Sequence, residues 1–497
     1  MNKIKKSLQS INLKLFAALL VMGLCPTIYT TLRVFFLGQL PGGWSYSIAG
    51  QLSWVNLIYE IISEAIILPL FFFMGSAISN KDDFSNKLKT GLILSGSIYA
   101  VLSIGIILFT EPLLTVMAAS PDIIKESATY IRIESIANVA GVLLNFVLVA
   151  LIAIGGDKLV YVFTVLKLAF CVVTDTFLIS TLPFSLNLGV NGIGYSNIIV
   201  NTILTIVILV ILSKEGYLVR DKQKLSFAWC KDFFKIGSIS GLESFVRNIA
   251  YMLMVSRMVN VVGESGVYWV ANNFIWGWML LPVLQLGELI KQEVSTDKNK
   301  IKTNTLGYFT ITTFICILWV VTIPLYKPFM QYVLNYSDVD KLFHLVMILF
   351  VFYIAFAYQN IFDMTFYGRG KTNYMLFESV VTNSIYYGGF FIAYRTGLWI
   401  PSLDGIALMF GVGTLFDAIV SGIAYRYYLR RYMIPKKRKE LIVLIDDRLF
   451  FIPDYRDLFS YNINPKFRVA FIYLFIFLVI YNACGTFSIC FSGFAVS

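Results

Sequence analysis

Ionisable side chains inside long apolar segments are the residues of this sequence that could carry chemistry. The candidates, taken together with one polar amide, are Arg33, Glu60, Glu64, Lys167, Asp175, Glu243, Arg247, Arg257, Asn273, Asp363 and Asp417. A charge at the centre of a bilayer costs roughly 3 kcal/mol or more, so each charged group needs an ion partner or a water-filled cavity. Side chains of this kind are typical of pathways for substrates, protons or ions.

A spacing of four residues places two groups of these candidates on shared helix faces. Glu60 and Glu64 are predicted to face protein or a cleft, because two carboxylates facing lipid would be very costly. There they would either form ion pairs with Arg33 or bind a coupling cation. Glu243 and Arg247 are predicted to form an ion pair within one helix.

Two arginines occupy similar places near the ends of two apolar segments. They are Arg33 in "LRVFFLGQLPG" and Arg257 in "SRMVNVVGESG". Two interpretations stay open: the guanidinium reaches the outer headgroups, or it faces a central cleft and pairs with an acid or an anionic substrate. Because the positions correspond, we expect one explanation to hold for both arginines.

Two further pairs of residues are candidates for moving protons. Lys167 and Asp175 stand two turns apart on similar faces of one segment. Lys167 is predicted either to pair with a neighbouring acid or to carry a proton itself. Asp363 and Asp417 lie deep in two later segments, and either could carry a proton.

Aromatic and basic side chains indicate contacts with lipid. Trp54, Trp276 and Trp278 follow the starts of apolar segments and are predicted chiefly as interfacial anchors, with pocket lining as the alternative. The run "KKRK" at 436–439 is predicted to lie against anionic lipid of the inner leaflet.

The composition indicates that these residues belong to a membrane protein. Of the 497 residues, 58% are apolar and 14% are charged, and the mean hydropathy is +0.75. An ordinary soluble domain has about 25% charged residues, so we predict an all-α integral membrane protein. Most of the 40 Lys and Arg residues lie in short stretches between apolar segments, a distribution that argues against a nucleic-acid partner.

The sequence favours neither an enzyme nor a metalloprotein. The six cysteines show no CxxC pair, and the single histidine, His344, rules out a His-based metal site or triad. No Walker A motif is present, so the chain has no ATPase site of that type. We therefore expect no metal and no cofactor, apart from a coupling sodium ion or proton.

Thirteen segments are long and apolar enough to cross a bilayer as helices. They cover residues 12–37, 51–79, 89–118, 128–154, 158–183, 190–213, 236–262, 268–290, 304–326, 341–367, 372–397, 404–428 and 467–490. The distribution of Lys and Arg predicts a multi-pass protein of the cell (inner) membrane, with a cytoplasmic N-terminus and an extracytoplasmic C-terminus.

The chain is predicted to contain two six-helix lobes and an addition. The lobes span 1–213 and 236–428, separated by a cytoplasmic linker at 214–235 and followed by a basic segment at 429–466 and an extra helix within 467–497. Internal repeats support this division. The motif "IAGQLSW" returns as "VANNFIW", "TEPLL" as "YKPFM" and "GGDK" as "GRGK". The lobes would therefore be parallel six-helix bundles related by a pseudo-two-fold axis along the membrane normal.

The chain resembles the MATE (multidrug and toxic compound extrusion) transporters, within the multidrug/oligosaccharidyl-lipid/polysaccharide flippase superfamily. The motifs that carry the resemblance are "FFLGQLPGG", "SIAGQ", "ESATYIRIES", "GGDKLVYVFTVLKLAFCVVTDTFLI", "LGVNGIG" and "FYGRGKTNYMLF". The resemblance implies two bundles around a V-shaped cleft that opens alternately to each side. It also implies that a cation gradient drives the efflux of amphipathic organic cations.

The sequence departs from this family at one telling position. Cation-coupled members usually have Asp five residues before the glycine that ends the first helix, where this chain has Arg33. The leading hypothesis is a secondary active transporter that exports small amphipathic compounds as an antiporter with sodium or protons. The alternative is a flippase or exporter of an anionic or lipid-linked substrate with a basic cleft. The expected partners are a small-molecule substrate, a coupling cation and membrane lipids, and the protein is expected to be a monomer.

Overall fold

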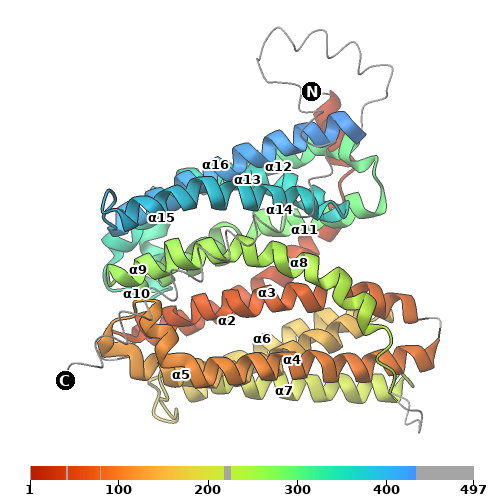
Figure 1. The fold of residues 1–497 in the computed structure, drawn as a ribbon, viewed down its shortest axis with the longest axis horizontal. Helices are drawn as coiled ribbons and strands as arrows, with labels where there is room; N and C mark the ends of the chain where they lie inside the picture. Colours follow the sequence, from red (N-terminus) through yellow and green to blue (C-terminus); the bar gives the residue numbers. More distant parts are fainter. Residues whose placement is uncertain (1, 41–42, 79, 218–224, 433–497) are drawn as a thin grey trace. The chain divides into compact units, whose positions relative to one another are not determined.

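Residues 2–40, 43–78, 80–217 and 225–432 are described by the computed structural model (Figure 1). The described residues form helices and connecting turns, with no strand among them. The predicted extra helix at 467–490 and most of the basic segment at 429–466 lie outside the described residues. The chain divides into two compact units, 1–424 and 425–497.

The described residues of the N-terminal half form seven helices. They are α1 (Asn2–Gln9), α2 (Leu13–Gly38), α3 (Ser45–Ala77), α4 (Lys81–Val116), α5 (Pro121–Ala153), α6 (Asp157–Leu178) and α7 (Asn191–Lys214). Six of them coincide with predicted apolar segments. The short α1 was not predicted, because its lysines resemble the basic flank of the first apolar segment.

Residues 225–432 of the C-terminal half form α-helices and three π-helical segments. They are α8 (Cys230–Tyr251), η1 (Met252–Ser256), α9 (Arg257–Val261), α10 (Ser265–Phe274), η2 (Ile275–Met279), α11 (Leu281–Thr296), α12 (Lys300–Tyr332), α13 (Val339–Gly368), α14 (Thr372–Val381), η3 (Thr382–Tyr387), α15 (Gly388–Arg395) and α16 (Leu403–Tyr432). Each π-helical segment interrupts one predicted apolar segment. Such segments are frequent at functional sites.

Eight of the described helices are long and apolar enough to cross a membrane. A ninth span arises if Ser265–Met279 and Leu281–Thr296, which meet at 53°, are counted as one. The bend has a local cause, since Pro282 lies in the first turn of α11 and removes a backbone donor from a continuous helix. The arrangement of twelve helices plus one stays a prediction.

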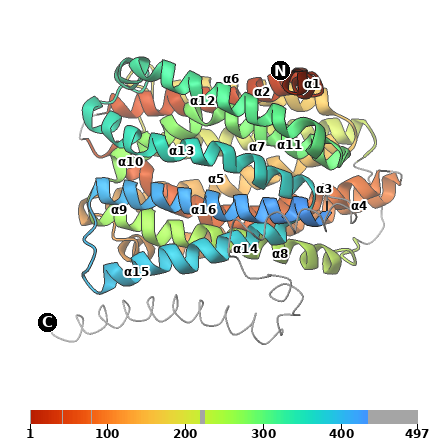
Figure 2. The same cartoon turned by 90° about the horizontal axis from the view of Figure 1, so that it is seen from above.

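Helices of each half pack on one another, and a few helices join the halves. Helix α5 packs on α4 and on α7 in the N-terminal half, and α11, α12 and α13 contact one another in the C-terminal half (Figure 1). Across the halves, α3 lies against α8 and α10, α2 lies against α11, and α1 lies against α12 (Figure 2). The helix α3 is therefore the main link between the halves.

Glycines allow α3 to approach its two partners closely. A Cβ atom on Gly237 of α8 would lie 2.1 Å from the Ala65 carbonyl oxygen, and one on Gly241 would lie 2.8 Å from Ala65 Cβ. Toward the other end of α3, a Cβ on Gly50 would lie 3.0 Å from the Ser265 carbonyl oxygen of α10. Close packing of this kind is typical of helix contacts in membranes.

Candidate functional site

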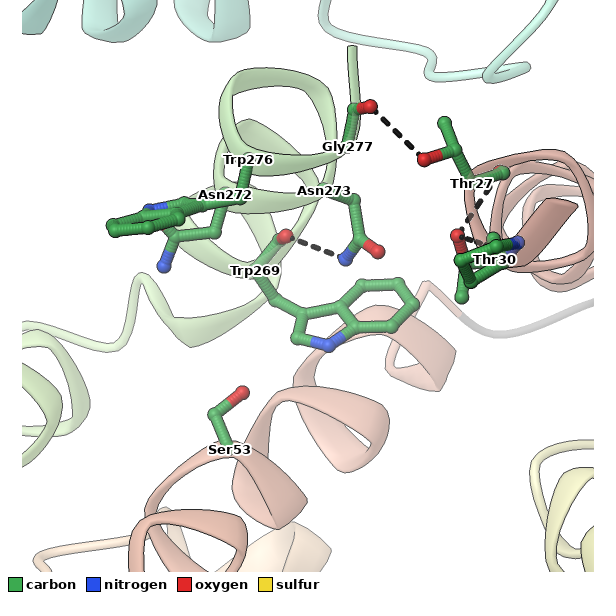
Figure 3. Close-up of a pocket in the computed structure, with 9 residues that line it drawn as sticks. Thr27, Thr30, Ser53, Trp269, Asn272, Asn273, Trp276 and Gly277 are labelled. Carbon is green, nitrogen blue, oxygen red and sulfur yellow. Dashed lines mark hydrogen bonds between the residues drawn. The ribbon is translucent and has the colours of Figure 1, made fainter. Parts of the chain in front are cut away.

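A cavity of about 360 Å³ lies between α2 and α3 of the N-terminal half and α10 and η2 of the C-terminal half (Figure 3). Its lining consists of Pro26, Thr27, Thr30, Ser53, Trp269, Asn272, Asn273, Trp276 and Gly277. None of these side chains is charged. The Asn272 Oδ1 atom is buried without a hydrogen-bond partner. Indole faces, amides and hydroxyls thus surround a space in which at least one acceptor is unused.

Local features of α2 and η2 shape this cavity. Pro26 interrupts the hydrogen-bond ladder of α2, because proline has no backbone N–H. The Thr27 hydroxyl lies 3.1 Å from the Gly23 carbonyl oxygen and 3.0 Å from that of Gly277, across the halves. The π-helical turn of η2 places Trp276 and Gly277 at the cavity wall.

A second cavity of about 280 Å³ shares four lining residues with the first and extends into the N-terminal half. The shared residues are Thr30, Ser53, Trp269 and Asn273. The others are Arg33, Ala49, Leu52, Asn56, Tyr130, Glu134, Asn138, Ile193 and Asn197. The uncharged cavity therefore continues into a region that contains one guanidinium and one carboxylate.

Arg33 forms a buried ion pair beside this second cavity. Its Nε atom lies 2.8 Å from Asp175 Oδ2 and its Nη2 atom 3.2 Å from Asp175 Oδ1, and the two side chains are 9% and 0% exposed. Arg33 Nη2 also donates to Asn197 Oδ1 at 2.9 Å. Asn197 Nδ2 in turn donates to Glu134 Oε1 at 2.9 Å. Arg33 thus faces the protein interior rather than the headgroups, and Asp175 neutralises its charge.

Glu60 and Glu64 pair with an arginine of the other half. Arg247 Nη2 lies 2.6 Å from Glu64 Oε1 and 3.3 Å from Glu60 Oε1. The prediction that Arg33 pairs with these carboxylates is wrong, because Arg33 is bonded to Asp175 instead. The predicted pair within α8 is present, with Arg247 Nη1 lying 3.5 Å from Glu243 Oε1. One guanidinium therefore forms ion pairs with three carboxylates where α3 packs on α8.

Among the described residues, neither Arg257 nor Lys167 forms the ion pair that one of its two predictions gave it. Arg257 Nε donates to the Val116 carbonyl oxygen at 2.9 Å, at the C-terminal end of α4, where a helix favours positive charge. Arg33 and Arg257 therefore do not share one explanation. Lys167 is half-buried in α6 and forms no salt bridge or hydrogen bond with any described residue. Its expected acidic partner, Asp175, is bonded to Arg33.

Acidic side chains gather between α13, α14 and α16. Asp417 accepts hydrogen bonds at 2.6 Å from Gln359 Nε2 and from the Thr382 hydroxyl of η3. Asp363 accepts from the Ser421 hydroxyl at 2.7 Å. Glu378, 3% exposed, and Gln359 each keep a buried Oε1 atom without a hydrogen-bond partner. Neither Asp363, Asp417 nor Glu378 forms a salt bridge with a described residue. We call Asp363, Asp417, Glu378 and Gln359 the acidic cluster.

The structure describes no group of three His, Cys, Asp or Glu side chains that could hold a metal ion together. Hydrogen bonds to amides and hydroxyls satisfy Asp363 and Asp417.

The interpretation as an interfacial anchor is wrong for Trp54, and the alternative of pocket lining holds for Trp276. Trp54 is 2% exposed inside the N-terminal half, and Trp276 lines the cavity. Trp278 Nε1 donates to the Thr31 hydroxyl across the halves at 2.8 Å. Hydropathy places these residues near the starts of apolar segments but does not reveal which side of the helix faces protein.

Several functional candidates were missed from the sequence. Glu134 and Glu378 lie inside the predicted segments 128–154 and 372–397, so the rule that selected the other intramembrane charges would also have selected them. Asn197, Trp269 and Asn272 carry no comparable signal, because uncharged polar and aromatic residues are common in such helices. Asn273 was predicted, and it lines both cavities.

Comparison with known proteins identifies the fold. No family model matches the chain, and neither does any curated protein sequence. A multidrug resistance MATE family transporter of the MOP superfamily, solved in an inward-facing conformation, matches 82% of this chain and 96% of its own, with a TM-score of 0.69 at 21% identity. A MOP superfamily transporter from Pyrococcus furiosus matches 86% and 98%, with a TM-score of 0.60 at 19% identity. The Vibrio cholerae MATE transporter VcmN, solved as a mutant, matches 87% and 99%, with a TM-score of 0.59 at 14% identity.

Proposed function

We propose that this chain, which has the fold of the MATE transporters as its sequence motifs predicted, is a secondary active transporter of the cell membrane. It exports small amphipathic organic compounds by alternating access of two lobes, in exchange for protons or sodium ions. The observation that carries this proposal is a cavity lined by both halves of the chain, which continues into a region where Asp175 neutralises the Arg33 guanidinium.

The buried and half-buried charges of the described helices favour a cationic or neutral substrate over an anionic one. Asp175 neutralises Arg33, which leaves the Glu134 carboxylate beside the second cavity. Arg247 faces three carboxylates, and the acidic cluster contains three more without an ion-paired base among the described residues. A surplus of negative charge attracts cations and repels anions.

This charge balance speaks against the alternative of a flippase or exporter for an anionic substrate. The Pyrococcus furiosus transporter is described as having a binding pocket of reversed polarity, which suggests a different function for that protein. Arg33 adds a positive group in this chain too. Its bidentate contact with Asp175, however, leaves little positive charge to attract an anion.

Two sets of bonds on α3 support alternating access. On one side of the cavity residue Ser53, the amides of Gln51 and Asn260 exchange hydrogen bonds of 2.8 and 3.0 Å across the halves. On the other side, Glu64 pairs with Arg247, also across the halves. In our proposal, rocking of the halves breaks one set of bonds at a time and opens the cavity to one side of the membrane.

The acidic cluster is the site that we propose for the coupling cation. Asp175 already holds a cation, because the Arg33 guanidinium is bonded to it. In the acidic cluster the buried Oε1 atoms of Glu378 and Gln359 are unused acceptors, and a proton or sodium ion would satisfy them.

The proposal can be tested by expression in a host that lacks its own exporters. We expect resistance to organic cations, and we expect Asp363→Asn and Glu378→Gln each to lower it at least tenfold, since neither variant can exchange its proton. Asp340→Asn is the matched control, because this carboxylate is 87% exposed and pairs with Lys327 in a surface salt bridge. Proteoliposomes with a proton or a sodium gradient identify the coupling ion. Transport of anionic compounds alone, or of no compound in a broad panel, would refute the proposal.

A further inference from the structure

The N-terminal helix α1 is bonded to the C-terminal half of the chain, although it precedes the first long helix. The Ser7 hydroxyl donates to the Thr303 carbonyl oxygen at 2.6 Å and accepts from the Gly307 N–H at 2.8 Å. A Cβ atom at Gly307 would lie 2.6 Å from Ile11 Cδ1 and 3.0 Å from Ser7 Oγ, so α1 and α12 approach closely at this glycine. Helix α1 therefore packs on the first turns of α12.

A buried carboxylate holds the turn that joins α1 to α2. Glu293 is 7% exposed, and it accepts from the Asn12 backbone N–H at 2.8 Å and from Asn304 Nδ2 at 2.6 Å. Lys300 Nζ donates to the Ser10 carbonyl oxygen at 2.8 Å. These bonds come from side chains of α11 and α12, so the start of the chain is fixed to the second half at several points.

The rest of α1 is basic and exposed. The exposed lysines of α1 and of the starts of α2 and α12 are Lys3, Lys5, Lys6, Lys14 and Lys302. No described residue forms a salt bridge with any of the five. Ile4, 39% exposed, lies among the lysines of α1 and is the outer end of an apolar stripe that continues to the buried Ile11. Asp297 is an exposed acid in the turn before α12.

We propose that α1 is an interfacial helix whose lysines bind the anionic phospholipid headgroups of the leaflet at which α2 and α12 begin. Both helices are long and apolar enough to cross the membrane, so their starts lie near its surface. An amphipathic helix at this depth presents Ile4 to the acyl boundary and its lysines to the phosphates. Because α1 is bonded to α12, the lipid surface is tied to the second half of the protein.

A bilayer is the partner that fits this surface, rather than a soluble anion. The lysines are spread over three separate helix starts and form no closed pocket, an arrangement typical of contacts with many headgroups. The exposed Ile4 adds an apolar element that a dissolved phosphate would leave in water. The surface is also separate from the cavity, since no lining residue belongs to α1 or α12.

Hydrogen exchange of the full chain in lipid nanodiscs tests this proposal. We expect the amides of residues 2–11 to exchange on the order of tenfold more slowly in nanodiscs that contain phosphatidylglycerol than in nanodiscs of phosphatidylcholine alone. High salt removes the difference, because the attraction is electrostatic. Dissolved glycerol phosphate added to phosphatidylcholine nanodiscs gives no protection.

Two triple variants make the experiment decisive. Lys3→Gln/Lys5→Gln/Lys6→Gln abolishes the slowing, whereas Lys125→Gln/Lys158→Gln/Lys214→Gln, which removes three exposed lysines elsewhere, retains it. Unchanged exchange in α4 and α5 shows that each variant is folded. Equal exchange in the two lipids, equal protection by dissolved glycerol phosphate, or slowing that persists in the α1 variant would each overturn the proposal.

Discussion

Arg33 and Asp175 show how a costly residue type is accommodated in the membrane. The guanidinium has two contacts with the carboxylate and a third with Asn197, and both charged side chains are almost fully buried. Removing one partner of a buried pair is far more harmful than removing both, because the remaining charge is left without compensation.

Asp175→Asn should therefore lower the free energy of unfolding by about 3 kcal/mol or more. The double variant Arg33→Gln/Asp175→Asn should regain a large part of this loss, since no charge is then left unpaired. Thermal unfolding in detergent measures both effects. Glu111→Gln is the control, because its salt bridge with Arg132 is half-exposed and contributes about 1 kcal/mol or less. A stability of Asp175→Asn equal to that of the unaltered protein would contradict the argument.

For single residues, the sequence identified the important side chains more accurately than it identified their partners. The cost of intramembrane charge identified Arg33, Asp175 and Arg247 as residues that need partners. It could not assign Asp175 to Arg33, or Glu64 to Arg247, because those contacts join helices far apart in the chain. Partner choice depends on how helices are rotated against one another, and hydropathy does not encode that rotation.

Helix α3 is the element on which the two halves meet. It packs on α8 at Gly237 and Gly241, and on α10 near Gly50. Both contacts depend on the absence of side chains, so they allow little adjustment. The predicted segments for α3, α4 and α5 ended within about two residues of the observed helices but began six to eight residues late, because the polar first turns of these helices lie outside the apolar segments.

Gly237→Val should separate α3 from α8 and destabilise the protein by about 1–3 kcal/mol, since its Cβ would lie 2.1 Å from the Ala65 carbonyl oxygen. Gly105→Ala is the control, because no atom lies within 4 Å of a Cβ at that position in α4. Its stability should be equal to or slightly above that of the unaltered protein. Apparent melting temperatures compare the two variants. A Gly237→Val variant as stable as the control would show that the helices separate at no cost.

For the whole molecule, the sequence repeats predicted two similar halves but not the bonds between them. The Gln51–Asn260 pair and the Glu64–Arg247 pair lie on opposite sides of Ser53 along α3. Neither pair could be inferred, because the repeats relate residues of equivalent position and these contacts join residues that are not equivalent. The cavity and its unused Asn272 acceptor likewise arise only from the packing of the halves.

A reversible cross-link tests whether the halves must separate during transport. In Gln51→Cys/Asn260→Cys, an oxidant should join the halves at their amide contact and stop transport, and a reductant should restore it. Substrate binding should change far less than transport, because the cavity remains. Arg132→Cys/Glu111→Cys, a pair within the N-terminal half, should keep its transport after oxidation. Full transport by the cross-linked Gln51→Cys/Asn260→Cys protein would exclude movement at this contact.

The bond between α1 and α12 also has a consequence for biosynthesis. Ser7 leaves the ribosome long before its partner Thr303, which lies 296 residues later in the chain. At a synthesis rate of about 5–20 residues per second, α1 waits for roughly 15–60 s before its docking surface exists. During that interval the membrane surface is the nearest partner for its lysines and for Ile4. The contact of α1 with lipid would then form early during synthesis. Its contact with α12 would be among the last to form.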